Sequence, residues 1–315
     1  MVMMGRNMKA ESTAEIVSLL LSGEDLELLA TVLARPGSGH QHALKEPGAA
    51  LTDELLLFLK ERMFSVAGAI ADIGDGLFES YAGSRWRAPF AFGVPECRAV
   101  IRAVTVALDA VERDDSPASD LGDRRRSSRE VEAQLCALRI CLQKEVARLG
   151  CDVETAVDRR AAREVVTPCP YLMLTPGELF CALGAIQYCW GPVATLPHVS
   201  PLYPDGDAIC AHVYGRLKAV FCALRRAEFD LKKHLTIPFG LTTWEADVLS
   251  LVLEFVVPEA ERDNDYELFP MLECRELRPN VDTLRALRTK VTKVVMESRG
   301  RRGEETSWPC GNEQQ

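Results

Sequence analysis

The sequence predicts an all-α protein, an irregular multi-helix bundle with one short extended edge segment near residues 163–174. Three observations predict this class. Apolar residues recur at helical spacing along most of the chain. Several of these runs begin with Ser or Thr followed three residues later by an acidic residue, the pattern of a helix N-cap. Long alternation of apolar and polar residues is missing, so we expect about eight to eleven helices and little sheet.

Three helices are predicted in the first quarter of the chain. Ser12 begins a capping-box pattern before the apolar run 16–21, which we interpret as helical. Ser22 and Asp25 repeat the pattern at the next helix. Thr52 is the expected N-cap of "LTDELLLFLKERMFSVAGAI", whose leucines follow helical spacing.

The second half carries the clearest helix starts. Thr175 is the expected N-cap, Pro176 suits the first helical position, and Glu178 completes a capping box. Thr242 and Glu245 repeat the arrangement before another apolar run.

The last predicted helix, "NVDTLRALRTKVTKVVMES", places Leu284, Leu287, Val291 and Val294 on one stripe. In "REVVTPCPYLML" the prolines confine any strand to the edge of a sheet, and this segment is the extended piece in the predicted fold.

Composition divides the chain into four parts. Residues 1–111 form an N-terminal helical part and residues 131–298 a C-terminal one. Residues 112–130 are charged and poor in apolar residues, which predicts a disordered linker, and 299–315 predict a disordered tail. We find no internal repeat at a solenoid period.

The totals exclude several classes. The chain has 315 residues, 47% of them hydrophobic, and a formal net charge of −9, which disfavours a protein that binds nucleic acid over its whole surface. We find no signal peptide and no apolar run of the ~18 residues that a membrane span needs. The eleven cysteines form no CxxC pair, so we expect an intracellular, reducing environment with mostly buried thiols.

The motifs of common enzymes are missing. There is no GxSxG, HExxH or GxxxxGK[ST], and no GxGxxG after a strand. We therefore predict that the protein is not an enzyme, with no catalytic residues.

We predict no cofactor, and zinc is the alternative that the residues leave open. Cys and His side chains bind zinc, and the candidate ligands are Cys189, His198, Cys210 and His212. Structural zinc sites bring their ligands in close pairs, and only Cys210 and His212 are close in the sequence. The alternative is that these thiols pack in the core.

Basic residues are concentrated in "VYGRLKAVFCALRRAEFDLKKHL", which includes Arg216, and in the last helix. They predict either a basic patch for an acidic partner or nucleic acid, or ordinary solvated helix faces. The candidate patch residues are Arg225, Arg226, Lys232, Lys233, Arg285, Arg288 and Lys293.

A proline-rich elbow follows the helix that Thr175 begins. Gly191 and Pro192 end that helix, and the prolines after them hold the chain extended at low entropic cost. Aromatic residues on a pre-set backbone suit a docking surface for another polypeptide. The alternative is that Trp190 fills a gap between helices. The candidate partner-binding residues are Tyr188, Trp190, Gly191, Pro192, Pro197, Pro201, Tyr203 and Pro204.

The stretch "LTPGELFCALGAIQYCWGPVATLPHVSPLYP" resembles the late-gene transcription regulators of beta- and gammaherpesviruses, in which a helix leads into a similar Cys-Trp-Gly-Pro corner and a proline-spaced stretch. "LTDELLLFLKERMFSVAGAI" is similar to an early helix of that family. The resemblance implies a non-enzymatic nuclear subunit of a viral pre-initiation complex. Its implied partners are other viral late-transcription subunits and host RNA polymerase II, with nucleic acid contacted only indirectly. The alternatives are a zinc-stabilised nucleic-acid-binding protein and a helical tegument protein.

Overall fold

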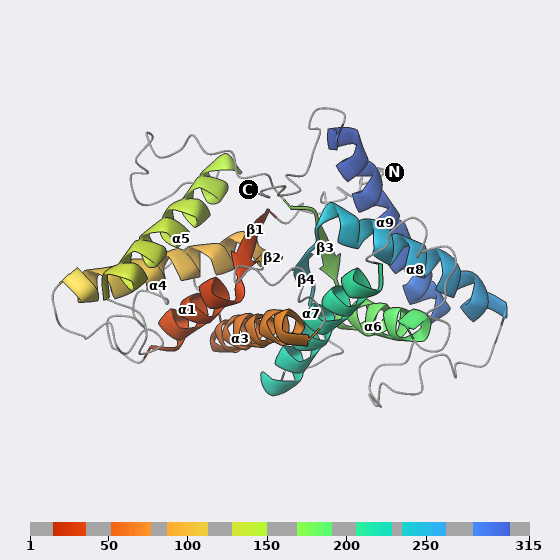
Figure 1. Cartoon of the computed structure of the whole chain (residues 1–315), viewed down its shortest axis with the longest axis horizontal. Helices are drawn as coiled ribbons and strands as arrows, with labels where there is room; N and C mark the ends of the chain where they lie inside the picture. The colour runs from red at the N-terminus through yellow and green to blue at the C-terminus, as the bar shows by residue number, and fades with distance from the viewer. Residues whose placement is uncertain are drawn as a thin grey trace, which may run out of the picture.

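The structure, a computed structural model, describes residues 15–35, 52–76, 87–112, 128–149, 169–190, 206–228, 235–262 and 280–302. Within these ranges the chain forms eight helices and two short antiparallel strand pairs (Figure 1). The predicted all-α class with short extended segments is therefore confirmed. Among the described helices, none is both long enough and apolar enough to cross a bilayer.

The elements of the first half lie on the left of Figure 1 and those of the second half on the right. The first half contains β1 (Ile16–Ser22), α1 (Gly23–Ala34), α3 (Asp53–Gly76), β2 (Arg87–Gly93), α4 (Val94–Glu112) and α5 (Ser128–Arg148). The second half contains β3 (Tyr171–Leu174), α6 (Pro176–Trp190), α7 (Gly206–Arg226), β4 (Ile237–Gly240), α8 (Thr243–Arg262) and α9 (Val281–Arg302).

The predicted helix over 16–21 is wrong, because this run is strand β1. It pairs antiparallel with β2 along its whole length, with Ile16 opposite Gly93 and Ser22 opposite Arg87. Nearly every residue of β1 is buried, so the run is apolar on both faces and carries no alternation. A short apolar run of this kind is ambiguous between buried strand and buried helix, and tertiary pairing decides.

Strand β2 has no counterpart among the predicted elements because Pro89 lies in its middle. Proline cannot donate to a strand ladder, so it normally argues against a strand. Here β2 belongs to a two-stranded sheet, and one of its edges makes no ladder bonds. Pro238 occupies β4 in the same way.

Three of the four predicted capping boxes are confirmed, whereas Ser12 of the fourth lies outside the described residues and the run after it is strand β1. At α1 the Ser22 hydroxyl accepts from the Asp25 amide at 3.1 Å, and the Asp25 carboxylate accepts from the Ser22 amide at 3.0 Å. Thr175 with Glu178 caps α6 in the same reciprocal way, and Thr242 with Glu245 caps α8. Each box satisfies amide donors that a helix start leaves unpaired. At α3 the Thr52 hydroxyl accepts from the Leu55 amide, as a simple N-cap.

The extended edge is confirmed in part, since β3 covers residues 171–174 while 163–168 lie outside the described residues. Of the predicted linker, residues 112–130, Glu112 belongs to α4 and residues 128–130 belong to α5, and the rest lies outside the described residues. Of the predicted tail, residues 299–315, residues 299–302 belong to α9, and the rest lies outside the described residues.

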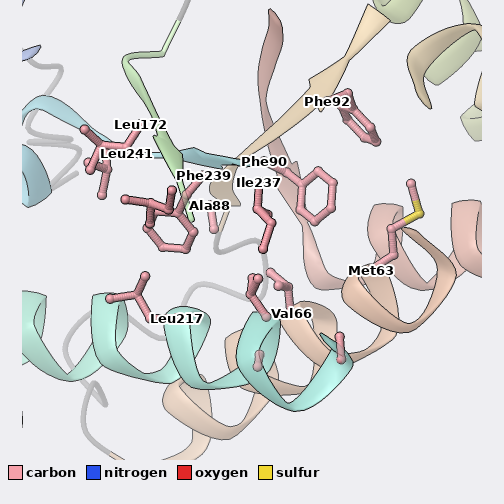
Figure 2. Close-up of a cluster of buried hydrophobic side chains, with 14 of the residues drawn as sticks. Met63, Val66, Ala88, Phe90, Phe92, Leu172, Leu217, Ile237, Phe239 and Leu241 are labelled. Atoms are coloured by element: carbon pink, nitrogen blue, oxygen red, sulfur yellow. The ribbon is translucent and has the colours of Figure 1, made fainter. Parts of the chain in front are cut away.

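The core is continuous across both halves. One cluster of buried side chains includes residues from all eight described helices and all four described strands. At its centre α3 packs on α7, and β2 packs on β4. Figure 2 shows Phe90, Ile237 and Phe239 pointing from the strands toward these two helices, where Val66 and Leu217 meet them. The two halves thus share one hydrophobic core.

Candidate functional site

The predicted elbow is described only at its start. Tyr188 is half-buried, and its ring stacks on Phe255 of α8 with centroids 6.5 Å apart. Trp190 is the last residue of α6. The remaining elbow residues lie outside the described part of the chain; they are Gly191, Pro192, Pro197, Pro201, Tyr203 and Pro204. The helix end from which the elbow departs is therefore fixed against α8.

The candidate zinc ligands have other surroundings where the structure describes them. Cys189 and Cys210 are buried. Burial raises the pKa of the Cys189 thiol to about 12, with a smaller contribution from Cys210. His198 lies outside the described residues, and in the described ranges no three His, Cys, Asp or Glu side chains are grouped so as to hold a metal ion.

The described cysteines are free thiols, half of them buried and half partly buried. Burial also raises the pKa of Cys181, to about 11, and that of Cys169, to about 12. They behave as the small hydrophobic residues that the sequence predicted.

His212 belongs instead to a buried polar cluster with Arg216 and Glu245. The His212 Nδ1 lies 2.7 Å from the Glu245 Oε1, and the Arg216 Nη2 donates to the same oxygen at 2.5 Å. The three side chains are 3%, 1% and 5% exposed for His212, Arg216 and Glu245 respectively. The other carboxylate oxygen, Oε2, accepts from the Thr242 amide at 2.6 Å. Glu245 thus completes a helix cap and neutralises a buried arginine.

The protonation states in this cluster follow from its charges. Burial opposes ionisation of Glu245, but the Arg216 charge, then His212 and the Thr242 amide, lower its pKa to about 2. Burial, followed by the positive charge of Arg216, lowers the pKa of His212, and Glu245 only partly offsets this. At neutral pH the histidine is uncharged. Because a carboxylate only accepts, the proton of the imidazole is on Nδ1.

Arg216 also binds backbone on both sides of the molecular centre. Its Nη1 donates to the Gly240 carbonyl of β4 at 3.0 Å and to the Pro89 carbonyl of β2 at 2.8 Å. Its guanidinium carbon lies 5.0 Å from the centroid of the Phe239 ring. A cation–π contact and charge-assisted hydrogen bonds together offset the cost of burying this cation.

A second buried arginine occupies the first half. The Arg62 Nη2 donates to the Ala91 carbonyl of β2 and to the Glu96 Oε2, both at 3.0 Å. Glu96 also accepts from the Gly93 amide at 2.9 Å, at the start of α4. The guanidinium carbon lies 4.7 Å from the Phe90 centroid. Below, the Arg62–Glu96 pair is called the first latch and the Arg216–Glu245 pair the second latch.

The predicted basic patch does not gather at one place in the described residues. Arg226, at the end of α7, lies 3.9 Å from Glu61 and 3.4 Å from the Ser65 hydroxyl of α3. Arg285 of α9 pairs with Glu261 of α8 at 2.8 Å and with Asp282. The other patch residues that the structure describes, Arg225, Arg288 and Lys293, lie on these same two helices, whereas Lys232 and Lys233 lie outside it. Arg226 and Arg285 lie beside acidic residues of two different helices, which favours solvated helix faces for these two residues.

The latches are the residues that sequence reasoning missed. Arg216 was grouped with a basic face, yet it is enclosed. The only signal was the apolar context of each arginine: Arg62 and Arg216 fall on the buried stripe of their helices, between Leu59 and Val66 and between Val213 and Val220. Glu245 was correctly predicted as a capping residue, but its second role needs a partner distant in the sequence.

The second latch and its neighbour His212 have the residue types of an acid–base site, but they are buried and hydrogen-bonded to one another like residues that stabilise a fold. A general base must reach the proton that it removes from a substrate. Here the carboxylate is bonded to an arginine, a histidine and an amide, and all three side chains are enclosed. The arrangement holds α7, β4 and α8 together and touches β2.

Comparisons of the chain with protein-family models, with curated proteins and with solved structures found no match.

Proposed function

We propose that this chain is a non-enzymatic adaptor subunit of a viral late-gene transcription complex. It acts by binding other viral subunits and the RNA polymerase II machinery through protein surfaces, in the host nucleus. The resemblance of residues 174–204 to herpesvirus late-gene regulators motivates the identity of the complex.

One observation carries the binding role. The side chains best suited to chemistry in the described structure, His212, Arg216 and Glu245, are enclosed and bonded to one another and to backbone. Their charges are balanced inside the protein, as expected of groups that hold a fold together. This supports a function exerted by surfaces rather than by an interior reaction centre.

The elbow after α6 is the proposed docking surface. Its base is rigid because Tyr188 stacks on Phe255 and Cys189 is buried in the core. Trp190 and the prolines after it follow directly in the sequence. A docking segment that departs from a fixed helix end loses little conformational entropy on binding.

The test is affinity purification of tagged full-length chain from infected cells, followed by mass spectrometry. We expect the wild-type chain to capture other late-transcription subunits and Trp190→Ala to lower that capture at least tenfold. Trp244→Ala, which removes a partly exposed tryptophan on α8, is the matched control and should capture normally. Far-UV circular dichroism shows that both variants are folded.

Normal capture by a folded Trp190→Ala variant would rule out the elbow as the surface. A chain that captures only virion structural proteins and leaves late transcripts intact would point to the tegument alternative. Stoichiometric zinc in the purified protein would point to the zinc-stabilised alternative.

A further inference from the structure

The two halves of the chain repeat one order of elements. Residues 16–149 run strand, helix, helix, strand, helix, helix, and residues 169–302 run through the same six elements. Figure 1 shows the two sets lying side by side, with the strands near the centre, α4 and α5 toward the left and α8 and α9 toward the right. Order alone is weak support, so the argument needs equivalent residues.

The strand pairs repeat the same register. In both pairs a leucine of the first strand faces the phenylalanine that follows the proline of the second. The four equivalent pairs are Ser18–Ala91 and Tyr171–Gly240, Leu19–Phe90 and Leu172–Phe239, Leu20–Pro89 and Met173–Pro238, and Leu21–Ala88 and Leu174–Ile237. A slip of one residue would turn every side chain of a strand to the other face, so the recurrence of one register is specific.

The helix that follows the first strand is capped and braced in the same way. The capping hydroxyl belongs to the last residue of the strand in the first half and to the next residue in the second half. In each half the acidic residue of the capping box binds a polar side chain of the sixth element. In the first half Ser22 and Asp25 form the capping box, and the Gln134 side-chain amide donates to Asp25 at 2.7 Å. In the second half Thr175 and Glu178 form the capping box, and the Lys290 ammonium donates to the Glu178 Oε2 at 2.8 Å.

The latches are equivalent as well. In each, an arginine of the third element donates to a carbonyl of the fourth and to a glutamate that caps the fifth, and it lies over the strand phenylalanine. The equivalent sets are Arg62, Ala91, Glu96 and Phe90, and Arg216, Gly240, Glu245 and Phe239. The short sequences around them, "PFAFGVPE" and "PFGLTTWE", share Pro, Phe and Glu at the same spacing.

The contacts between the halves join equivalent elements to each other. Helix α3 packs on α7, its counterpart, and β2 packs on β4, its counterpart. Contact between the same surface on two copies is the mark of a two-fold interface.

We infer that the chain is a tandem duplication. Residues 16–149 and 169–302 are two copies of one β-α-α-β-α-α unit, paired about an approximate two-fold axis through α3–α7 and β2–β4. The surface of each unit formed by its third and fourth elements is an interaction surface whose partner is a copy of the same unit.

Two-fold pairing makes a geometric prediction that an unrelated pair of domains does not. The path from the end of the first unit to the start of the second equals the path from the end of the second to the start of the first. A copy of residues 150–168 therefore suffices to join Arg302 to Glu15. The test is a full chain in exchanged order, in which 169–302 precedes this linker and 15–149.

We expect the exchanged chain to be monomeric, to keep the helical circular dichroism of the parent and to unfold at the same urea midpoint within about 0.3 M. The matched control uses the same linker between Arg302 and Glu15 but opens the chain within 113–127. It separates α4 from α5 inside one unit and should unfold at a lower midpoint. An exchanged chain that fails to fold, or that is no more stable than this control, would overturn the two-fold pairing.

A second measurement does not depend on refolding a rearranged chain. A specific protease site inserted in the full chain between 150 and 168 allows the folded protein to be cut between the units. The two pieces should remain a one-to-one complex in native mass spectrometry, with at least tenfold weaker pairing in Arg216→Met than in Arg225→Met, a substitution at an exposed residue of α7. Pieces that separate at tens of micromolar would contradict the paired surface.

Discussion

The first and second latches are the same arrangement of a buried arginine, a glutamate and a strand carbonyl, and they differ in what else the arginine contacts. In the first half Arg62 binds Glu96 and the Ala91 carbonyl, all within its own half. In the second half Arg216 makes the equivalent bonds and also reaches the Pro89 carbonyl in the other half. Four residues before each arginine stands Phe58 in the first half and His212 in the second. The hydrogen bonds of the first latch stay within the first half, whereas the second latch also joins the two halves of the chain.

The difference explains the composition around Arg216. Gly240 lies so close to Pro89 that a Cβ on it would come within 2.9 Å of the Pro89 backbone. This approach lets one guanidinium bond the carbonyls of both strands. The glutamate there carries an additional hydrogen bond from His212, which ties α7 to α8 once more. The comparison predicts that equivalent substitutions cost more in the second half.

The largest difference is expected on removing the arginines. Arg216→Met leaves Glu245 as a buried charge without its cation and costs about 3–5 kcal/mol of unfolding free energy. Arg62→Met also leaves a buried glutamate, but it breaks no bond between the halves, so it should cost less than Arg216→Met. Urea denaturation measures both, with the exposed Arg226→Met as a control expected within about 1 kcal/mol of wild type. If the two substitutions lowered the free energy of unfolding equally, the second latch would not contribute more than the first by joining the two halves.

The glycines offer the next largest contrast. Gly240→Ala forces a methyl group against the Pro89 backbone and should cost about 1–3 kcal/mol. Gly68→Ala lies in α3 with open space around it and should stabilise by up to about 1 kcal/mol through helix propensity. Thermal unfolding of the two variants checks the pair, and a neutral Gly240→Ala would show that the strands do not approach so closely.

His212 gives the second latch a pH dependence. Its pKa is lower in the folded chain than the ordinary 6.5, so the unfolded chain takes up a proton first. Stability therefore falls as the pH drops through 6.5, at a slope of at most about 1.4 kcal/mol per pH unit. His212→Phe, which copies the residue at the equivalent position, should abolish this decline.

Glu245 adds a second decline at lower pH. Its pKa is about 2 in the folded chain against an ordinary 4.5, so its contribution is full above pH 4.5 and is lost as the pH falls toward 2. His212→Phe should retain this acid limb. Urea midpoints between pH 2 and 8 separate the two declines; an unchanged slope near pH 6.5 in the variant would contradict the assignment to His212.

The smallest expected effects are at the caps. Ser22→Ala and Thr175→Ala each remove the hydroxyl that accepts an amide at a helix start and should each cost about 1 kcal/mol. Near-equal values support equivalent roles. A difference between the two above about 1 kcal/mol, measured by urea denaturation, would argue against that equivalence.

Local signals predicted the fold class because they depend on neighbours in the sequence. The capping boxes at Ser22, Thr175 and Thr242 each need residues only three apart, and all were predicted correctly. Strand β1 was mistaken for helix because its apolar run makes sense only beside β2, which is distant in the sequence.

The duplication and the latches could not be predicted from the sequence, because they also depend on residues that are distant in the sequence. The two halves share few residues, and their connecting segments differ in length, so equivalent positions do not recur at one fixed spacing. Arg216 was interpreted as a surface residue because a cation is buried only when distant groups neutralise it. Those groups, Glu245 and the Pro89 carbonyl, become neighbours only in the folded chain.

The most direct test of equivalent latches is a pair of double-mutant cycles in the full-length chain. One cycle combines Arg62→Met with Glu96→Gln, and the other combines Arg216→Met with Glu245→Gln, each followed by urea denaturation. We predict favourable coupling of about 1–3 kcal/mol in both cycles, the range for residues in one buried network. Coupling within about 0.3 kcal/mol of zero in either cycle would contradict the account.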